Sequence, residues 1–269
     1  MIKLATIAGS DASGGAGLEA DLKTFQEYGG YGMAAVTVIA TMNPDKEWGH
    51  DVFPIEEKSL KAQLETIFKG IGPDAAKTGM LATNYAVELS AEYLKKYGIK
   101  NYVLDPVMIC KCGNLPLNPE LNNLIIKKLL PLAKIITPNV FEAGQIAGTD
   151  TPETLEQIKE AAKKIHGLGV PFVFIKGGSK IKDAKTSVDI FYDGKEFFEV
   201  EAELIDTQWT HGAGCTTAAA ITAGLGAGLG PFEAVKLAKK FITSSLKNGF
   251  QLNRWVGPGN PAAWRKEFR

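Results

Sequence analysis

The chain contains, at residues 2–28, the stretch IKLATIAGSDASGGAGLEADLKTFQEY, in which three patterns follow one another. The apolar run Ile2–Ala8 predicts a strand, the glycines within 14–17 predict a tight loop, and apolar residues at helical spacing from Leu18 onward predict a helix. A strand, a glycine loop and a helix in this order begin a parallel β-α-β unit. This stretch therefore favours an α/β fold.

The same alternation of apolar strands and amphipathic helices continues along the chain, which is typical of a parallel sheet covered on both faces. Val188–Tyr192 and Glu196–Val200, with the turn Asp193-Gly194 between them, instead predict an antiparallel pair. No polar linker divides the chain, so we expect a single domain over residues 1–269. The other expected strands are Ala34–Ala40, Ala75–Gly79, Tyr102–Leu104, Lys134–Thr137 and Phe172–Lys176, and the other expected helices are Glu56–Lys69, Asn84–Tyr97, Leu121–Leu130, Glu142–Ala147, Thr154–Gly167, Thr216–Ala227 and Phe232–Asn248.

The composition excludes several classes of protein. The 269 residues include 30 Lys and Arg and 30 Asp and Glu, so the formal net charge is zero. A neutral chain has no general attraction to nucleic acid or to an anionic membrane. No apolar run approaches the roughly 20 residues that span a bilayer. We therefore expect no nucleic-acid or membrane partner, and any anionic ligand must be bound by local groups.

The cysteines indicate a cellular compartment. Cys110, Cys112 and Cys215 are an odd number of thiols, which does not suit a disulfide framework. No cationic and apolar leader stands at Met1. We therefore expect a protein of the reducing cytoplasm.

The first glycine loop has two interpretations. Gly15-x-Gly17-x-x-Ala20 matches a dinucleotide-binding pattern, but Met42-Asn43-Pro44 stands where that pattern needs an acid after the second strand. The chain also lacks the phosphate-loop motif G-x-x-x-x-G-K-[ST]. The loop is therefore either a flexible strand-to-helix turn or a ligand-binding loop of another kind.

A second glycine loop, Thr210-His211-Gly212-Ala213-Gly214-Cys215, precedes a helix rich in small residues. Glycines allow backbone N–H groups to approach a ligand, and the unpaired N–H groups at a helix start favour anions, phosphate above all. A cysteine there would have a stabilised thiolate. The alternative is a tight turn with a buried structural thiol.

Three further strand ends carry polar residues. Asp105 follows a buried strand, where open α/β sheets place their ligands, and could hold a metal ion or orient a hydroxyl group, or could be a turn residue. Asn139 and Glu142 could contact magnesium and phosphate or could cap the following helix. The run Lys176-Gly177-Gly178-Ser179-Lys180 could surround a nucleotide phosphate or form a solvated basic loop.

Taken in order, these motifs make the chain similar to the hydroxymethylpyrimidine kinases of the ribokinase superfamily, and more closely to their pyridoxal-kinase branch. The resemblance extends from about Ile2 to Pro258, and its motifs are specific as an ordered set. The motifs are Ala8-Gly9-Ser10-Asp11, Gly14-Gly15-Ala16-Gly17, Ala20-Asp21-Leu22-Lys23-Thr24-Phe25, Lys77-Thr78-Gly79-Met80, Asp105-Pro106-Val107-Met108, Thr137-Pro138-Asn139, Lys176-Gly177-Gly178 and His211-Gly212-Ala213-Gly214-Cys215.

The resemblance implies a ribokinase-like three-layer fold, ATP and Mg²⁺ as cofactors, and transfer of a phosphoryl group to the hydroxymethyl group of a pyridine or pyrimidine alcohol. It also implies a homodimer. The implied site residues are Cys215, Cys110, Gly212, Ala213, Gly214 and His211 for catalysis, Ser10, Asp21, Met42, His50 and Val107 for the substrate, Asn139, Lys176, Gly177, Gly178, Ser179 and Lys180 for the nucleotide, and Asp105 and Glu142 for the metal ion.

Two positions distinguish the branches. Hydroxymethylpyrimidine kinases carry a Gln that pairs with the aminopyrimidine, whereas this chain has Met42, whose thioether cannot form that paired hydrogen bond. The pyridoxal-kinase branch carries a cysteine in a segment that resembles a lid, and this chain has Cys110 within residues 108–116. The resemblance therefore favours vitamin B6 as the substrate, with hydroxymethylpyrimidine as the alternative.

The expected mechanism has two thiols. Cys215, with a lowered pKa, would accept the proton of the substrate alcohol. His211 could assist by a hydrogen bond or could simply shape the turn. Cys110 could add reversibly to the pyridoxal aldehyde. Two other classes remain as rivals: a ribokinase-like module without catalysis, and a nicotinamide oxidoreductase that uses the first glycine loop.

Overall fold

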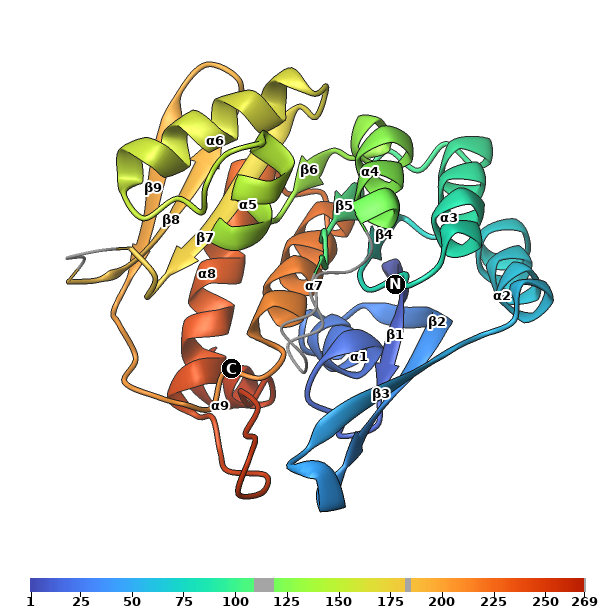
Figure 1. The fold of residues 1–269 in the computed structure, drawn as a ribbon, viewed down its shortest axis with the longest axis horizontal. Coiled ribbons are helices and arrows are strands. Elements are labelled where there is room, and N and C mark those ends of the chain that lie inside the picture. The colour runs from blue at the N-terminus through green and yellow to red at the C-terminus, as the bar shows by residue number, and fades with distance from the viewer. Residues whose placement is uncertain (109–118, 182–184, 269) are drawn as a thin grey trace.

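The computed structural model describes residues 1–108, 119–181 and 185–268. Its strands form one nine-stranded sheet in the order β3-β2-β1-β4-β5-β6-β7-β8-β9 (Figure 1). Neighbours from β2 to β7 are parallel, whereas β3, β8 and β9 each pair antiparallel with the preceding strand in sequence. The mainly parallel α/β sheet is therefore confirmed. The strands are β1 (Lys3–Asp11), β2 (Tyr31–Asn43), β3 (Gly49–Pro54), β4 (Ala75–Thr78), β5 (Tyr102–Leu104), β6 (Ile135–Ile136), β7 (Phe172–Gly178), β8 (Ser187–Tyr192) and β9 (Phe197–Ala202).

Helices cover both faces of the sheet, which completes three layers. One face carries α2 (Glu57–Leu64), α3 (Asn84–Lys96), α4 (Pro119–Lys128), α5 (Val140–Ala147) and α6 (Leu155–Gly167). The other face carries α1 (Gly17–Glu27), α7 (Ala213–Gly226) and α8 (Pro231–Lys247), with α9 (Ala263–Phe268) against α8.

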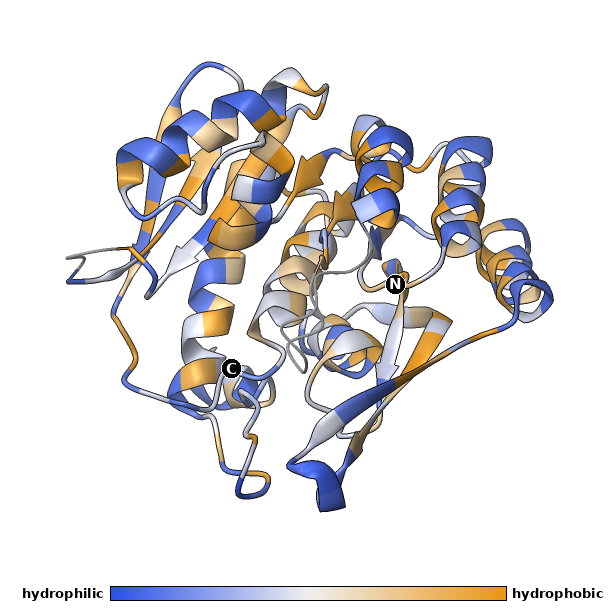
Figure 2. Cartoon of the chain, viewed as in Figure 1, coloured by the Kyte–Doolittle hydropathy of each residue, from blue (hydrophilic) through white to orange (hydrophobic). Residues whose placement is uncertain are grey.

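The central parallel strands are mainly apolar because each must fill both helix layers. In β5, Tyr102 and Leu104 pack into the core under α2 to α6, whereas Val103 packs into the core under α7 and α8. None of the three side chains is more than 1 % exposed. Figure 2 shows this arrangement as apolar strands at the centre and helices whose polar sides face outward. Continuous apolar runs therefore mark the buried parallel strands of this protein.

Two elements were not predicted from the sequence. Strand β3 lies at the edge of the sheet, is half-buried or exposed along its length, and has no run of alternating apolar residues. It forms because it pairs with β2, from Asn43↔Gly49 to Val38↔Pro54. The short helix α9 depends in the same way on a distant partner, because it packs on α8.

Several predicted helix boundaries differ from the structure by one or two residues, and two predicted helices differ more. The helix expected at Glu56–Lys69 is α2 followed by a π-helical segment, Glu65–Ile71. Helix α7 begins at Ala213, three residues earlier than expected, because Gly212 supplies the left-handed turn that precedes it. This earlier start places Cys215 inside the first turn of α7 and not before it.

In the part of the chain that the structure describes, no helix is both long and apolar enough to cross a membrane.

Candidate active site

A cavity of about 560 Å³ opens at the carboxyl ends of the parallel strands. The chain moves from β1 to β2 on one side and later places β4 on the other side of β1. Ligand crevices of open α/β sheets form at such a change of direction. The predicted site residues that line the cavity are Ser10, Met42, His50, Asp105, Val107, Asn139, Glu142, Lys176, Gly178, His211, Gly212, Ala213, Gly214 and Cys215.

Four predicted site residues lie away from the cavity. Asp21 is fully buried and stands behind the wall, so the expected direct contact with the substrate is wrong. Strand β7 continues to Gly178, which pairs with Val188 of β8, so the loop begins later than expected. Gly177 is therefore buried within the strand, whereas Ser179 and Lys180 are exposed outside the cavity.

Cys110 lies outside the described residues. Of the predicted lid at 108–116, the structure describes only residue 108. Met108, the first residue of that segment, is buried in the core under α2 to α6.

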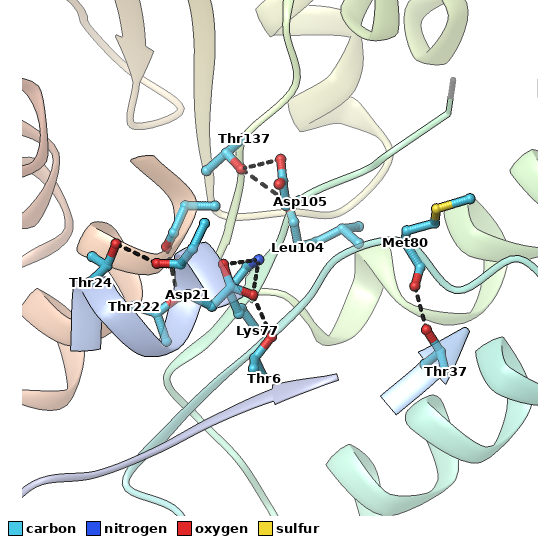
Figure 3. Close-up of polar contacts among 12 residues, drawn as sticks. Thr6, Asp21, Thr24, Thr37, Lys77, Met80, Leu104, Asp105, Thr137 and Thr222 are labelled. Carbon is cyan, nitrogen blue, oxygen red and sulfur yellow. Dashed lines mark hydrogen bonds and ion pairs between the residues drawn. The ribbon is translucent and has the colours of Figure 1, made fainter. Parts of the chain in front are cut away.

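Asp105 and Lys176 form an ion pair in the cavity wall, from the ends of β5 and β7. Lys176 Nζ donates to Asp105 Oδ1 at 2.9 Å, and Thr137 Oγ1 donates to the same oxygen at 3.2 Å (Figure 3 shows the Thr137 contact). Burial lowers the pKa of Lys176, but the charges of Asp105 and Glu142 outweigh it and raise that pKa above its ordinary value. The structure therefore presents a permanent cation at the cavity wall.

Asn139 and Glu142 cap the start of α5 reciprocally. Asn139 Oδ1 accepts from the Glu142 N–H, and Glu142 Oε2 accepts from the Asn139 N–H, both at 2.9 Å. The helix-cap alternative is therefore confirmed. Both residues also line the cavity. Burial of Glu142 raises its pKa to about 7, with Lys176 lowering it and the charge of Asp105 raising it further.

The two glycine loops meet at Asp11, the last residue of β1. Its carboxylate accepts the Ala16 N–H at 2.8 Å and lies 2.6 Å from His211 Nε2. Gly212 has φ 78°, and a side chain at this position would collide with the carbonyl group of Gly15. The loop at 211–214 therefore rests directly on the backbone of the loop at 14–17, and only glycine allows that approach.

A sealed ion pair, with both side chains 0 % exposed, extends from the cavity wall into the protein. Lys77 Nζ donates to both carboxylate oxygens of Asp21 at 2.9 Å, and Thr6 Oγ1 donates to Asp21 at 2.6 Å. Figure 3 shows these three side chains converging from β4, α1 and β1. Burial lowers the pKa of Lys77, but the charges of Asp21, Cys215 and Asp105 raise it. Lys77 lines the cavity, so Asp21 serves to hold a cation there.

The expected lowered pKa of Cys215 is wrong. Burial raises the pKa of this thiol to about 11; the charge of Lys77 opposes the increase, and the charges of Asp105 and Asp21 add to it. A hydrogen bond from the Gly17 backbone is a smaller, opposing effect. Desolvation of the thiolate therefore raises the pKa more than the helix start, on which the prediction rested, lowers it.

A third buried pair lies at the other end of the cavity. Lys239 of α8 donates to Asp189 of β8 at 2.8 Å, and Asp189 also accepts the Gly178 N–H at 2.9 Å. Both charged residues line the cavity, and neither was predicted from the sequence. Lys239 and Asp189 lie inside segments with ordinary amphipathic patterns, so no local signal marks them. Lys77 could have been found from the sequence, because it lies near the end of a short strand and begins the motif Lys77-Thr78-Gly79-Met80.

Comparisons with known proteins agree with this geometry. Residues 11–260 match the model of the family described as phosphomethylpyrimidine kinase. The chain is 52 % identical to the pyridoxine kinase of Bacillus subtilis over 98 % of this chain and 97 % of that one. It superposes on a solved structure of an ADP complex of Bacillus subtilis pyridoxal kinase with a TM-score of 0.95 and 52 % identity, over 98 % and 99 % of the two chains. It also superposes on Staphylococcus aureus pyridoxal kinase in complex with AMP-PCP and pyridoxal, with a TM-score of 0.93 and 44 % identity, over 99 % and 96 %.

Proposed function

The chain belongs to the phosphomethylpyrimidine kinase family, and from this membership we propose that it transfers the γ-phosphoryl group of ATP to the hydroxymethyl group of a vitamin B6 vitamer. The observation that carries this proposal is the cavity at the strand ends. Its wall brings together a permanent cation, Lys176, the carboxylates of Asp105 and Glu142, and the glycine loop at 212–214. The pyridoxal and ATP-analogue complex of the Staphylococcus aureus relative supports the same pair of substrates.

Phosphoryl transfer needs little covalent work from a protein. The transition state spreads negative charge over the transferred group, so catalysis consists of alignment and charge stabilisation. Lys176 Nζ lies beside Gly214, 3.4 Å from the place that a Cβ atom at that position would take. We assign this ammonium group and the N–H groups of Gly212 and Gly214 to the transferred phosphoryl group, because both act on the same small region of the cavity. The N–H of Ala213, between them, donates instead to the Thr210 carbonyl at 3.1 Å.

Asp105 and Glu142 fit the magnesium ion that accompanies ATP. Hard cations prefer oxygen ligands, and Mg²⁺ bound with nucleotide phosphates usually needs only one or two carboxylates. Among the described residues no group of three His, Cys, Asp or Glu side chains could hold a metal ion without other ligands, so the phosphates would supply the remaining ligands. When bound, the ion neutralises phosphate charge. Glu142 is suited to a nearby cation. Its pKa of about 7 shows that the positive charge of Lys176 does not fully offset the burial of its carboxylate.

Cys215 is the group we assign to the proton of the substrate alcohol. Its thiol lines the cavity next to the glycine loop, inside the first turn of α7. With a pKa raised to about 11, the thiol of the ligand-free chain is protonated at neutral pH and accepts a proton only after losing its own. Turnover should therefore increase with pH between 6.5 and 9 if the thiolate is the base.

The wall of the cavity favours pyridoxal over pyrimidine. Met42 of β2 and His50 of β3 are cross-strand neighbours, and both line the cavity. A thioether offers no paired hydrogen bond to an aminopyrimidine, whereas the apolar wall accommodates a methylated pyridine ring. Hydroxymethylpyrimidine remains the second candidate substrate, because the matching family is described by its action on phosphomethylpyrimidine.

The proposed function is tested by ADP release from purified protein with pyridoxal, pyridoxine, pyridoxamine and hydroxymethylpyrimidine. We expect the B6 vitamers to give the highest kcat/KM. Preference for hydroxymethylpyrimidine would move the protein to the second candidate function. ATP turnover with none of the four alcohols would support a module without catalysis.

The proposed aldehyde chemistry of Cys110 is tested in the same assay. Pyridoxine has no aldehyde, so Cys110→Ala should lower turnover of pyridoxal more than turnover of pyridoxine. Equal losses for the two substrates would remove the covalent step.

The homodimer and the cytoplasmic location implied at the level of sequence stay predictions. Light scattering of the purified chain would measure the first, and fractionation of cells would test the second.

A further inference from the structure

The Asp11 carboxylate joins two chain segments that are 200 residues apart. Within its own loop, Oδ1 accepts the Ser13 N–H and Oδ2 accepts the Ala16 N–H, both at 2.8 Å. Oδ2 also lies 2.6 Å from Nε2 of His211 in the second glycine loop. One carboxylate therefore shapes the first loop and binds the second.

The direction of the His211 hydrogen bond follows from charge. Burial raises the pKa of Asp11, but the hydrogen bonds from His211 and Ser13 and the charge of His211 outweigh burial and lower it to about 2. An ionised carboxylate only accepts hydrogen bonds, so His211 Nε2 must carry a proton. The contact is thus a charge-assisted hydrogen bond, which is stronger than one between neutral groups.

The contact also sets the place of the second loop. The His211 N–H donates to the Gly257 carbonyl at 3.2 Å, which holds the backbone on one side. The side chain holds the other side through Asp11, whose own N–H donates to Glu19 Oε2 at 2.8 Å. Gly212, the next residue, lies against Gly15, so any shift of His211 moves the start of α7.

We propose that Asp11 and His211 are positioning residues, which hold the N–H groups of Gly212 and Gly214 where the transferred phosphoryl group must lie. This inference rests on the kinase reaction proposed above and assigns a role to Asp11, which needs no contact with either substrate. Misplacement of a reacting group by about 1 Å can lower a rate by roughly 100-fold. Loss of the contact should therefore lower kcat more than it changes the KM for ATP.

Two substitutions of His211 test the hydrogen bond itself. The amide nitrogen of Gln reaches the place of Nε2, whereas that of Asn reaches only the place of Nδ1. We expect His211→Asn to lower kcat by about 100-fold and His211→Gln by less than about fivefold, with the KM for ATP within about threefold in both. Equal losses in the two variants, or no loss in either, would overturn the proposal.

Asp11→Asn tests the other partner. An amide offers one accepting oxygen, so it cannot satisfy the loop N–H groups and His211 together. We expect a loss of kcat similar to that of His211→Asn. The matched control is Asp193→Asn, because Asp193 also accepts two backbone N–H groups in a turn but lies between β8 and β9, outside the cavity. Normal turnover of Asp11→Asn would contradict the proposal.

Hydrogen exchange of the peptide that covers residues 206–216 separates this inference from the proposed function. His211→Asn should speed exchange of its amides by at least about tenfold, and His211→Gln should not, whatever alcohol the enzyme phosphorylates. If wild-type protein phosphorylates none of the four alcohols but exchange follows this pattern, the proposed function fails while the role of the contact in holding the loop stands. Unchanged exchange in His211→Asn would overturn that role.

Discussion

Lys77–Asp21 and Lys176–Asp105 are two ion pairs of the same length, 2.9 Å, but they differ in what surrounds them. Both side chains of the first pair are 0 % exposed, and its carboxylate stands behind the cavity wall. In the second pair Lys176 is 16 % exposed, and both partners line the cavity. In the sealed pair only Lys77 lines the cavity, whereas both partners of the open pair can contact a ligand. We infer that the first pair stabilises the fold and fixes a cation at the cavity wall, whereas the second pair contacts the reacting groups.

The largest effect should come from breaking the sealed pair. Asp21→Asn leaves the Lys77 ammonium buried without its counter-charge, which should lower the free energy of unfolding by about 3–5 kcal/mol. Urea unfolding of the purified variants measures this loss. The double variant Asp21→Leu with Lys77→Met should recover most of it, because an apolar pair of similar volume removes both buried charges. Equal losses in the single and the double variant would contradict a structural role.

Breaking the open pair should mainly reduce activity. Lys176→Met removes the cation that stabilises the negative charge on the transferred phosphoryl group, so kcat should decrease by about 100- to 1,000-fold. The free energy of unfolding should decrease by at most about 2 kcal/mol, because Asp105 keeps Thr137 as a partner and faces the cavity. Steady-state kinetics and urea unfolding on the same sample compare the two effects. Lys195→Met, in an exposed turn, is the control and should change neither.

The Asp11–His211 pair is about as exposed as the open pair, at 6 % and 15 %, and its carboxylate predicts that stability depends on pH. The pKa of Asp11 in the folded chain, about 2, is below that of an ordinary Asp. Its stabilisation is therefore complete above pH 4 and is lost as pH falls through 2, with a size of about 2 kcal/mol. Between pH 5 and 2, the free energy of unfolding, measured with urea, should decrease less steeply in Asp11→Asn than in wild type. Parallel curves would exclude this contribution.

The smallest expected effect is the electrostatic effect of the sealed pair on the pKa of Cys215. Lys77 lowers the pKa of the Cys215 thiol more than Asp21 raises it. The double variant Asp21→Leu with Lys77→Met should therefore alkylate more slowly at Cys215, by a few-fold and at most about tenfold at pH 8. Mass spectrometry of the peptide that contains Cys215 measures the rate with iodoacetamide. An unchanged or faster rate would mean that the sealed pair has no such effect on the thiol.

The parallel part of the fold was predictable because its signals are local. Tyr102–Leu104 was expected as a strand and is β5, since three apolar residues between helices have few alternatives. Strand β3 was missed because its backbone is held by β2, and its own residues show no alternation. The start of α7 was placed too late because the left-handed turn at Gly212 depends on its contact with Gly15.

The site was predictable where a polar residue ends a strand. Asp105 and Lys176 were expected at the sheet edge because the carboxyl ends of parallel strands meet there, and the structure joins them in one pair. Asp11 and Asp189 were missed because their importance lies in partners 200 and 50 residues away. Asp21 was assigned to the substrate because the resemblance places it at a position that lines the ring pocket, but it faces Lys77 instead.

Periodicity, glycine loops and strand ends are properties of neighbouring residues, so the amino-acid order was enough to predict the layered α/β fold and the edge that carries the cavity. Burial and charge pairing depend on distances across the folded chain. They made Asp21 a support for Lys77, and they raised the pKa of Cys215 although its helix start favours the thiolate. Desolvation acts on the whole surroundings of a group, and only the packed molecule defines those surroundings.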